Sequence, residues 1–298
     1  MEKRIGITGM MPIEIIFDSG SVPLDVRNFF LYHPDRMNFV QRAEMDGFPH
    51  NAGLLEKGIY GTIMEEKIQE VIVIIQNDCI NGWTLRKMLE LQGVTVHTFT
   101  FPPENNREMI EMQINELAER LGLANLNNLD YWKFRLNEAR ELAHKIDELT
   151  WNSNLVSGYE NHKYLTSTTD FEGDLDVFMT KLYNFLNELK TAKPFKQKVR
   201  LALIGEPPLC TEIYKIVEKC GARIVFNEVQ RQYTIPFSSS DLIDQYLKYT
   251  YPYSISGRVK DIKEQIKKRK IHGIIHCVNT HGSGFADDLI FRRQLGLP

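Results

Sequence analysis

The feature that most constrains the fold of this chain is an unbroken run of β-branched residues at 71–75 (VIVII). Such a run lacks the alternation of a half-exposed strand and is typical of a parallel strand buried on both faces. Residues 84–92 then carry apolar side chains at helical spacing, and Gly93 follows as a C-cap. Residues 94–99 (VTVHTF) form the next expected strand. A strand, a helix and a strand in this order predict a parallel crossover unit.

The same order of elements returns in the second half of the chain. Apolar runs predict strands, and helical spacing predicts helices between them, at 199–205, 211–219, 222–226, 256–270, 273–278 and 285–295. Two short apolar segments open the chain, at 4–8 and 13–17, and the second could start a helix instead of a strand. The sequence therefore predicts an α/β protein with parallel sheets.

The middle of the chain is predicted to be helical. Three apolar stripes at helical spacing, within residues 110–121, 132–146 and 175–189, indicate helices that pack on a core. The polar and aromatic segment 151–170 suits either a surface loop or a segment that lines a site. We expect a boundary near residues 190–198, which gives an N-terminal α/β domain with a helical insertion (1–195) and a C-terminal α/β domain (196–298).

Charge and cysteine usage limit the class of protein. The 36 Lys and Arg against 39 Asp and Glu give a formal charge of -3, which offers no electrostatic case for a nucleic-acid or membrane surface. The longest apolar run, 71–75, is far below the ~20 residues of a membrane span, and no secretory signal opens the chain. Its 4 cysteines are scattered, which indicates reduced thiols. We expect a cytoplasmic protein that binds neither nucleic acid nor membrane.

Polar segments follow four of the predicted strands. In open parallel sheets, ligands bind beyond the carboxyl ends of the strands, and the segments 76–82, 206–208, 227–232 and 279–284 fall at such ends. Any one of them could be an ordinary loop, but the four together favour a site. The candidate substrate-binding residues are Asn77, Asp78, Asn227, Glu228 and Gln230.

Cys79 is the candidate metal ligand. It follows a buried strand and precedes a helix, where the helix amides favour a thiolate, although a structural thiol is the commoner alternative. His276 and His281 could complete a metal site with Cys79, but such histidines are more often hydrogen-bonded structural groups. The sequence contains no Walker loop, no GxGxxG, no HExxH and no nucleophile elbow, so the mechanisms that depend on them have no support.

Several motifs resemble the 2-hydroxyacyl-CoA dehydratase family, which also includes benzoyl-CoA reductase subunits. In the first half these are GFP at 47–49, KGIYG at 57–61 and NDCIN at 77–81. The second half is closer still, with IGEPP at 204–208, GARIVFNEVQRQ at 221–232, YPY at 251–253 and HCV at 276–278. The chain looks most like the D-component of 2-hydroxyglutaryl-CoA dehydratase, over nearly its whole length.

The resemblance implies a fold, a cofactor and partners. It implies two flavodoxin-like parallel-sheet domains with an additional helical segment and an acyl-CoA site in the cleft between them. It also implies a homo- or heterodimer with a related subunit, and a four-iron four-sulfur cluster held by three cysteines. An ATP-dependent activator protein would supply the electron for a radical dehydration. Thiolates are the usual ligands of such clusters.

The sequence departs from the family at two of the three cysteine positions. Glycine replaces cysteine at Gly53 and Gly282, and only Cys79 matches. Glycine has no side chain that could bind iron, so we expect no cluster held in the family manner. The chain also ends earlier than typical members, which would leave a sheet edge open to a partner chain.

Two functions follow from the sequence. In the first, the chain is a dehydratase-type subunit that keeps an acyl-CoA cleft and performs the radical dehydration of the family, or works beside a cluster-bearing partner. In the second, it is a non-catalytic binding or scaffold subunit of the same fold that pairs with a cluster-bearing partner. The polar residues after the strands favour the first function, and the two glycines favour the second.

Overall fold

The computed structural model describes residues 3–75, 80–126, 128–253, 255–278 and 284–298. The chain forms two compact units, and each draws on separate stretches of the sequence. The first unit comprises Met1–Leu136, Thr169–Asp174 and Ser239–Leu247; the second comprises Asn137–Thr168, Leu175–Ser238 and Lys248–Pro298. The domain boundary between residues 195 and 196 stays a prediction.

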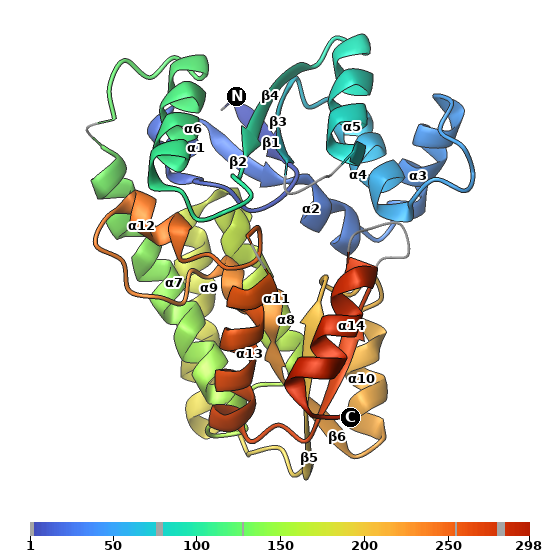
Figure 1. Ribbon diagram of the computed structural model, residues 1–298, viewed down its shortest axis with the longest axis vertical. Helices are drawn as coiled ribbons and strands as arrows, with labels where there is room; N and C mark the ends of the chain where they lie inside the picture. The colour runs from blue at the N-terminus through green and yellow to red at the C-terminus, as the bar shows by residue number, and fades with distance from the viewer. Residues whose placement is uncertain (1–2, 76–79, 127, 254, 279–283) are drawn as a thin grey trace. The chain divides into compact units, whose positions relative to one another are not determined.

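The first unit contains a four-stranded parallel sheet in the order β2-β1-β3-β4 (Figure 1). The strands are β1 (Arg4–Ile7), β2 (Val22–Asp25), β3 (Glu70–Ile75) and β4 (Thr95–Thr100). Strands β1, β3 and β4 agree with the predicted ones. Strand β2 was not predicted, because it has only 4 residues and contains Pro23. Proline is tolerated there since β2 is an edge strand.

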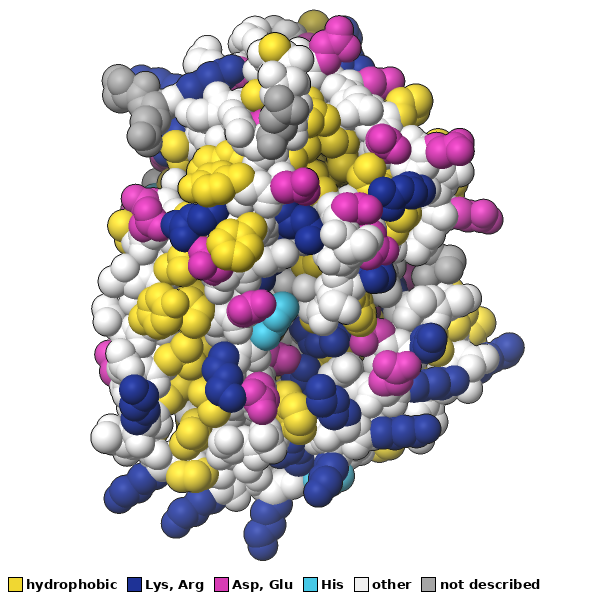
Figure 2. Space-filling model, turned by 90° about the vertical axis from the view of Figure 1, so that its left-hand side faces the viewer, with side chains coloured by type: hydrophobic (Ala, Val, Ile, Leu, Met, Phe, Trp, Pro, Cys, Tyr) yellow, Lys and Arg dark blue, Asp and Glu magenta, His cyan; other side chains and the backbone are white. Residues whose placement is uncertain are grey.

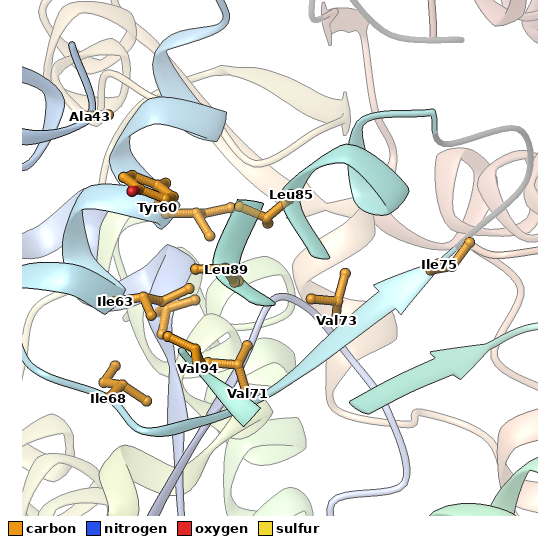
Figure 3. Packing of buried hydrophobic residues seen from close by; sticks show 12 residues of the cluster. Ala43, Tyr60, Ile63, Ile68, Val71, Val73, Ile75, Leu85, Leu89 and Val94 are labelled. Atoms are coloured by element: carbon orange, nitrogen blue, oxygen red, sulfur yellow. The ribbon is translucent and has the colours of Figure 1, made fainter. Parts of the chain in front are cut away.

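Strand β3 is buried on both faces, as its sequence predicts. On one face, Val71 and Val73 belong to a core cluster with Leu85 and Leu89 of the helix α5 (Ile80–Leu91) (Figure 3). On the other face, Ile72 and Ile74 are buried as well. The central strand therefore offers no exposed face for chemistry, which leaves its ends.

The helices of the first unit surround this sheet. They are α1 (Glu14–Asp18), α2 (Val26–Tyr32), α3 (Arg36–Met45), α4 (Leu54–Glu65), α5, α6 (Arg107–Arg120) and α12 (Leu242–Leu247), and the long helix α7 (Leu129–Trp151) begins here and continues in the second unit. The segment 13–17 thus starts a helix. Its buried Glu14 accepts hydrogen bonds from Gln245 Nε2 at 2.9 Å and from the Tyr246 hydroxyl at 2.8 Å. Helix α12, far along the chain, therefore satisfies a carboxylate that the first turn of α1 buries.

The second unit contains a three-stranded parallel sheet in the order β6-β5-β7. Its strands are β5 (Val199–Gly205), β6 (Ala222–Asn227) and β7 (Gly273–Cys277). All three agree with the predicted strands within one residue. Two parallel sheets with helices between their strands confirm the predicted α/β class and are consistent with two flavodoxin-like domains.

The second unit also holds most of the helices of the middle and the end of the chain. They are α8 (Gly158–Thr166), α9 (Leu175–Glu188), α10 (Glu212–Lys219), α11 (Glu228–Tyr233), α13 (Ile255–Arg269) and α14 (Gly284–Leu295). Three short 3-10 helices complete the chain, at Ser167–Thr169, Phe171–Gly173 and Leu189–Thr191.

Helix α8 corrects one expectation. The interpretation of the segment 151–170 as a surface loop is wrong for residues 158–166, which form a helix with buried polar side chains. Asn161 is 0% exposed, and its Nδ2 donates to Asp147 Oδ1 at 3.0 Å and to Thr150 Oγ1 at 3.1 Å. Polar residues can fill a core when other elements supply their hydrogen-bond partners. Those partners are not visible in the local sequence.

The length and hydropathy of the helices bear on whether any of them could span a membrane. Among the described residues, no helix combines the length and the apolar character that crossing a bilayer would require.

The packing of β3 predicts very different costs for two leucines of α5. Leu89 is 0% exposed within the core cluster, whereas Leu91 is 75% exposed. We expect Leu89→Ala to lower the free energy of unfolding by about 2–5 kcal/mol, because it leaves a cavity in the core. Leu91→Ala is the matched control and should change it by less than about 0.5 kcal/mol. Urea unfolding followed by circular dichroism measures both, and equal effects would contradict this packing.

Candidate functional site

The carboxyl end of the second sheet is built around Gly205, the last residue of β5. Its φ of +83° is left-handed, which favours glycine. A Cβ at this position would lie 2.3 Å from the carbonyl oxygen of Cys277 and 2.8 Å from Cδ2 of His276. Strand β7 therefore approaches β5 so closely at this end that only glycine fits.

Glu228 closes the same end from the neighbouring strand. It follows β6 as the first residue of α11 and is 1% exposed. Its Oε2 accepts the backbone N–H of Gly205 at 2.8 Å. Arg258 of α13 donates to Oε1 through Nε at 2.8 Å and to Oε2 through Nη2 at 2.9 Å. A bidentate arginine is the strongest partner available to a buried carboxylate.

Arg258 is enclosed by further groups. Its Nη1 lies 3.3 Å from Asp287 Oδ2, and its guanidinium lies over the rings of Tyr251, at 4.9 Å, and Phe291, at 5.0 Å. Burial lowers the pKa of Arg258, but the carboxylate of Glu228 outweighs it, so the pKa is raised above its ordinary value. The guanidinium is therefore a fixed positive charge that ties α11, α13 and α14 to the sheet.

His276 lies on β7 beside this ion pair. Its Nδ1 is 2.8 Å from Asp288 Oδ1, and the ring meets the Phe291 ring edge-on with centroids 5.1 Å apart. Asp288 Oδ2 also accepts from Arg292 Nε at 2.6 Å. Arg292, and after it His276, lower the pKa of Asp288, so this carboxyl group stays ionised. The described contacts agree with a hydrogen-bonded His276.

Asn227 and Gln230, which flank Glu228, turn toward α8. The Asn227 side chain accepts from the Tyr214 hydroxyl at 2.8 Å and donates to Asn161 Oδ1 at 2.7 Å. Gln230 Nε2 lies 3.0 Å from His162 Nδ1. Both side chains are 0% exposed. The structure thus separates them from Glu228, which alone of the three points to the end of β5, and a role in substrate binding stays a prediction for all three.

A second charged cluster lies at the carboxyl end of β2 in the first unit. Asp25 is 0% exposed, and it accepts from the backbone N–H groups of Arg27 and Asn28 and from the Thr169 hydroxyl. Asp170 Oδ2 in turn accepts the backbone N–H of Asp25 at 2.8 Å. Burial, and after it the charge of Asp25, raise the pKa of Asp170 to about 7. Two carboxyl groups therefore share one buried site at this edge of the sheet.

A comparison with protein-family models identifies the family of the chain. The model of the 2-hydroxyglutaryl-CoA dehydratase D-component matches residues 8–286. The chain belongs to this family. The match confirms the resemblance drawn from the motifs. No curated protein matches the chain.

Membership in the D-component family raises the question of its iron–sulfur cluster. Gly53 is described: it is the N-cap of α4, with φ −56° and ψ 140°, and it has no side chain to bind iron. Cys79 and Gly282, together with Asn77 and Asp78, lie outside the described residues. The resemblance puts two of the three ligand positions at glycine, and this assignment stays a prediction. With glycine at those positions, the chain would not fit a cluster that needs three thiolates.

The described cysteines do not supply the missing thiolate ligands. Cys210 and Cys220 flank α10 and are exposed. Burial, and after it the charge of Glu206, raise the pKa of Cys277, which favours its neutral thiol over the thiolate that binds iron. Within the described part of the chain, no three His, Cys, Asp or Glu side chains gather where they could hold a metal ion.

Sequence reasoning missed the partners of the site residues. Arg258 stands 30 positions after Glu228, and Asp288 stands 12 positions after His276. No motif links either pair, because helices that come later in the chain supply the second member. The sequence did place Glu228 and the end of β7 beyond the parallel strands, and the structure has both at the carboxyl end of the second sheet.

The ion pair at the end of β5 predicts a large loss of stability in Glu228→Gln. The variant leaves the buried guanidinium of Arg258 without its main counter-charge. We expect the free energy of unfolding to fall by about 3–5 kcal/mol. Lys145→Gln is the control, since it breaks an exposed pair with Glu148 and should cost less than about 1 kcal/mol. Chemical unfolding measures both, and similar small losses would contradict a buried ion pair.

The raised pKa of Asp170 predicts a pH-dependent effect of Asp170→Asn. The folded pKa of about 7 lies above the ordinary aspartate value of 3.8, so the folded protein binds the proton more tightly than the unfolded chain does. The stability that this proton confers is complete below pH 3.8 and is lost as the pH rises through 7. The asparagine of the variant does not titrate, so the variant does not lose this stability. Its free energy of unfolding relative to that of the wild type should therefore rise by roughly 1.4 kcal/mol per pH unit between the two pKa values. Urea unfolding at several pH values measures it, and a flat difference would contradict a raised pKa.

Proposed function

We propose that the chain is a 2-hydroxyacyl-CoA dehydratase-type subunit of the cytoplasm that binds an acyl-CoA and works beside a cluster-bearing partner. The observation that carries this proposal is the family match, which spans residues 8–286 and so includes every described strand except β1. The charged carboxyl end of the second sheet supports it, because ligands of open parallel sheets bind at such ends.

The chain's own part in this reaction is binding. Gly53 and Gly282 stand where the family has cluster cysteines, so a related subunit with all three cysteines would carry the cluster and receive the electron from an ATP-dependent activator. This division of labour makes the chain one half of a heterodimer.

The surface of the protein supports a partner subunit. Several large apolar side chains are well exposed, among them Met45 at 77%, Leu91 at 75% and Phe134 at 63%. Figure 2 shows hydrophobic side chains in several groups on one face, between acidic and basic ones. Aromatic residues and methionine are enriched in protein interfaces. A homodimer would use the same surfaces.

The alternative is a non-catalytic binding or scaffold subunit. The burial of Asn227 and Gln230 favours it, because both side chains already hydrogen-bond within the protein. In that case the charged end of the second sheet serves stability alone.

Iron analysis and acyl-CoA binding distinguish the two functions. We expect the chain purified without oxygen to contain no iron or sulfide and to bind acyl-CoA compounds in calorimetry. About four irons per chain would contradict the division of labour between two subunits. A chain with no iron and no binding of acyl-CoA would favour the scaffold.

Cys79 offers a second test of the proposal. We expect Cys79→Ser to weaken ligand binding while the thermal unfolding midpoint stays unchanged, because the proposal places this thiol at the site. Cys220→Ser is the control, since Cys220 is exposed beside α10 and should affect neither measurement. Lower stability of Cys79→Ser with unchanged binding would identify Cys79 as a structural thiol.

A further inference from the structure

Two histidines mark the opposite ends of strand β7 and differ in their hydrogen bonds. His272, just before the strand, accepts the backbone N–H of Arg200 on its Nδ1 at 3.1 Å. A neutral His272 must therefore carry its proton on Nε2. His276, near the end of the strand, places its Nδ1 2.8 Å from Asp288 Oδ1. Because a carboxylate only accepts, His276 must donate from Nδ1, and the neutral ring then has its lone pair on Nε2.

The ring of His276 is held firmly in this orientation. Asp288 fixes one nitrogen and is itself fixed by Arg292, and the edge-on ring of Phe291 packs against the imidazole. On the other side the ring lies against Gly205, where an added Cβ would come within 3.0 Å of Nε2. A carboxylate that orients an imidazole is the usual way to fix which nitrogen accepts.

The Nε2 of His276 is the acceptor left over at this end of the sheet. Among the described residues, Asp288 is the only hydrogen-bond partner of the ring, and 11% of the side chain is exposed. The histidine lies at the carboxyl end of β7, where ligands of parallel sheets bind, whereas His272 lies at the amino end.

The surrounding charges limit what Nε2 can bind. Glu228, Asp287 and Asp288 gather here, and the guanidinium of Arg258 is already shared between the first two. An anionic group would meet this negative charge, and the described arginines here, Arg258 and Arg292, are already paired with carboxylates. A neutral donor, such as a hydroxyl group, fits a bare imidazole nitrogen.

We infer that His276 is a binding residue whose Nε2 accepts a hydrogen bond from the hydroxyl group of a 2-hydroxyacyl thioester, and that Asp288 is its positioning residue. This inference rests on the proposed function for the acyl-CoA part of the ligand. The hydroxyl specificity comes from the geometry of the Asp288–His276 pair.

Nitrogen NMR of the imidazole rings tests the positioning step without any ligand. At a pH where both imidazole rings are neutral, we expect His276 to be the Nδ1–H tautomer and His272 to be the Nε2–H tautomer. Asp288→Ala removes the acceptor and should increase the Nε2–H form of His276 while His272 keeps its signals. An Nε2–H tautomer of His276 in the wild type would overturn the inference.

Two thioesters that differ by one hydroxyl group test the binding step. The wild type should bind 2-hydroxypropanoyl-CoA about tenfold more tightly than propanoyl-CoA in calorimetry, the ratio expected for one hydrogen bond. His276→Asn keeps a donor for Asp288 but lacks Nε2, so it should bind both thioesters equally. His272→Asn is the matched control and should keep the tenfold ratio, and thermal unfolding confirms that both variants fold.

The outcomes separate this inference from the proposed function. If both thioesters bind and His276→Asn keeps the wild-type ratio, the inference is overturned while the proposed function stands. If the wild type binds neither thioester, the proposed function fails and the inference falls with it. If only His276→Asn loses the tenfold preference for 2-hydroxypropanoyl-CoA, the result supports both the inference and the proposed function.

Discussion

The burial of parallel strands on both faces governs where this protein can place polar chemistry. Every residue of β3 after Glu70, and every residue of β6, is buried, so a polar group inside the sheets must find a partner in another element. The ends of the strands escape this limit. Gly205, Glu228 and His276 all lie at one such end, and the close approach of β5 and β7 at Gly205 brings them together. The position of the candidate site thus follows from the way the sheets are covered.

Buried charges then hold the helices onto the second sheet. Arg258 pairs with Glu228, and Arg269 pairs with Asp147 through Nη1 at 2.8 Å and Nη2 at 2.5 Å. Each arginine comes from α13 and meets a carboxylate on another helix. Such pairs add little net stability over apolar packing, but removing one member is costly. Their effect is to fix the orientation of α13, and with it the place of Arg258 at the carboxyl end of β5.

The sequence reveals the sheets far better than it reveals the site. Runs of apolar residues identify β3, β5 and β6, because a buried parallel strand has a local signature. Strand β2 escapes notice, since an edge strand of 4 residues with Pro23 has no such signature. The polar sequence of α8 does not distinguish a loop from a buried helix. Asp147 and Asn227 satisfy the buried Asn161, and both lie outside the segment 151–170. The pairs Glu228–Arg258 and His276–Asp288 are likewise contacts between separate elements that only the fold brings together.

The divided make-up of the first unit has a consequence for synthesis on the ribosome. The carboxylates of Glu14 and Asp25 are buried near the start of the chain, yet their hydrogen-bond donors include Thr169, Gln245 and Tyr246. A nascent chain that has exposed only its first 136 residues would have to bury these carboxylates without those partners. The first unit therefore reaches its final form only after translation has passed residue 247, when much of the second unit has already emerged. Folding of this protein cannot run domain by domain in the order of the sequence.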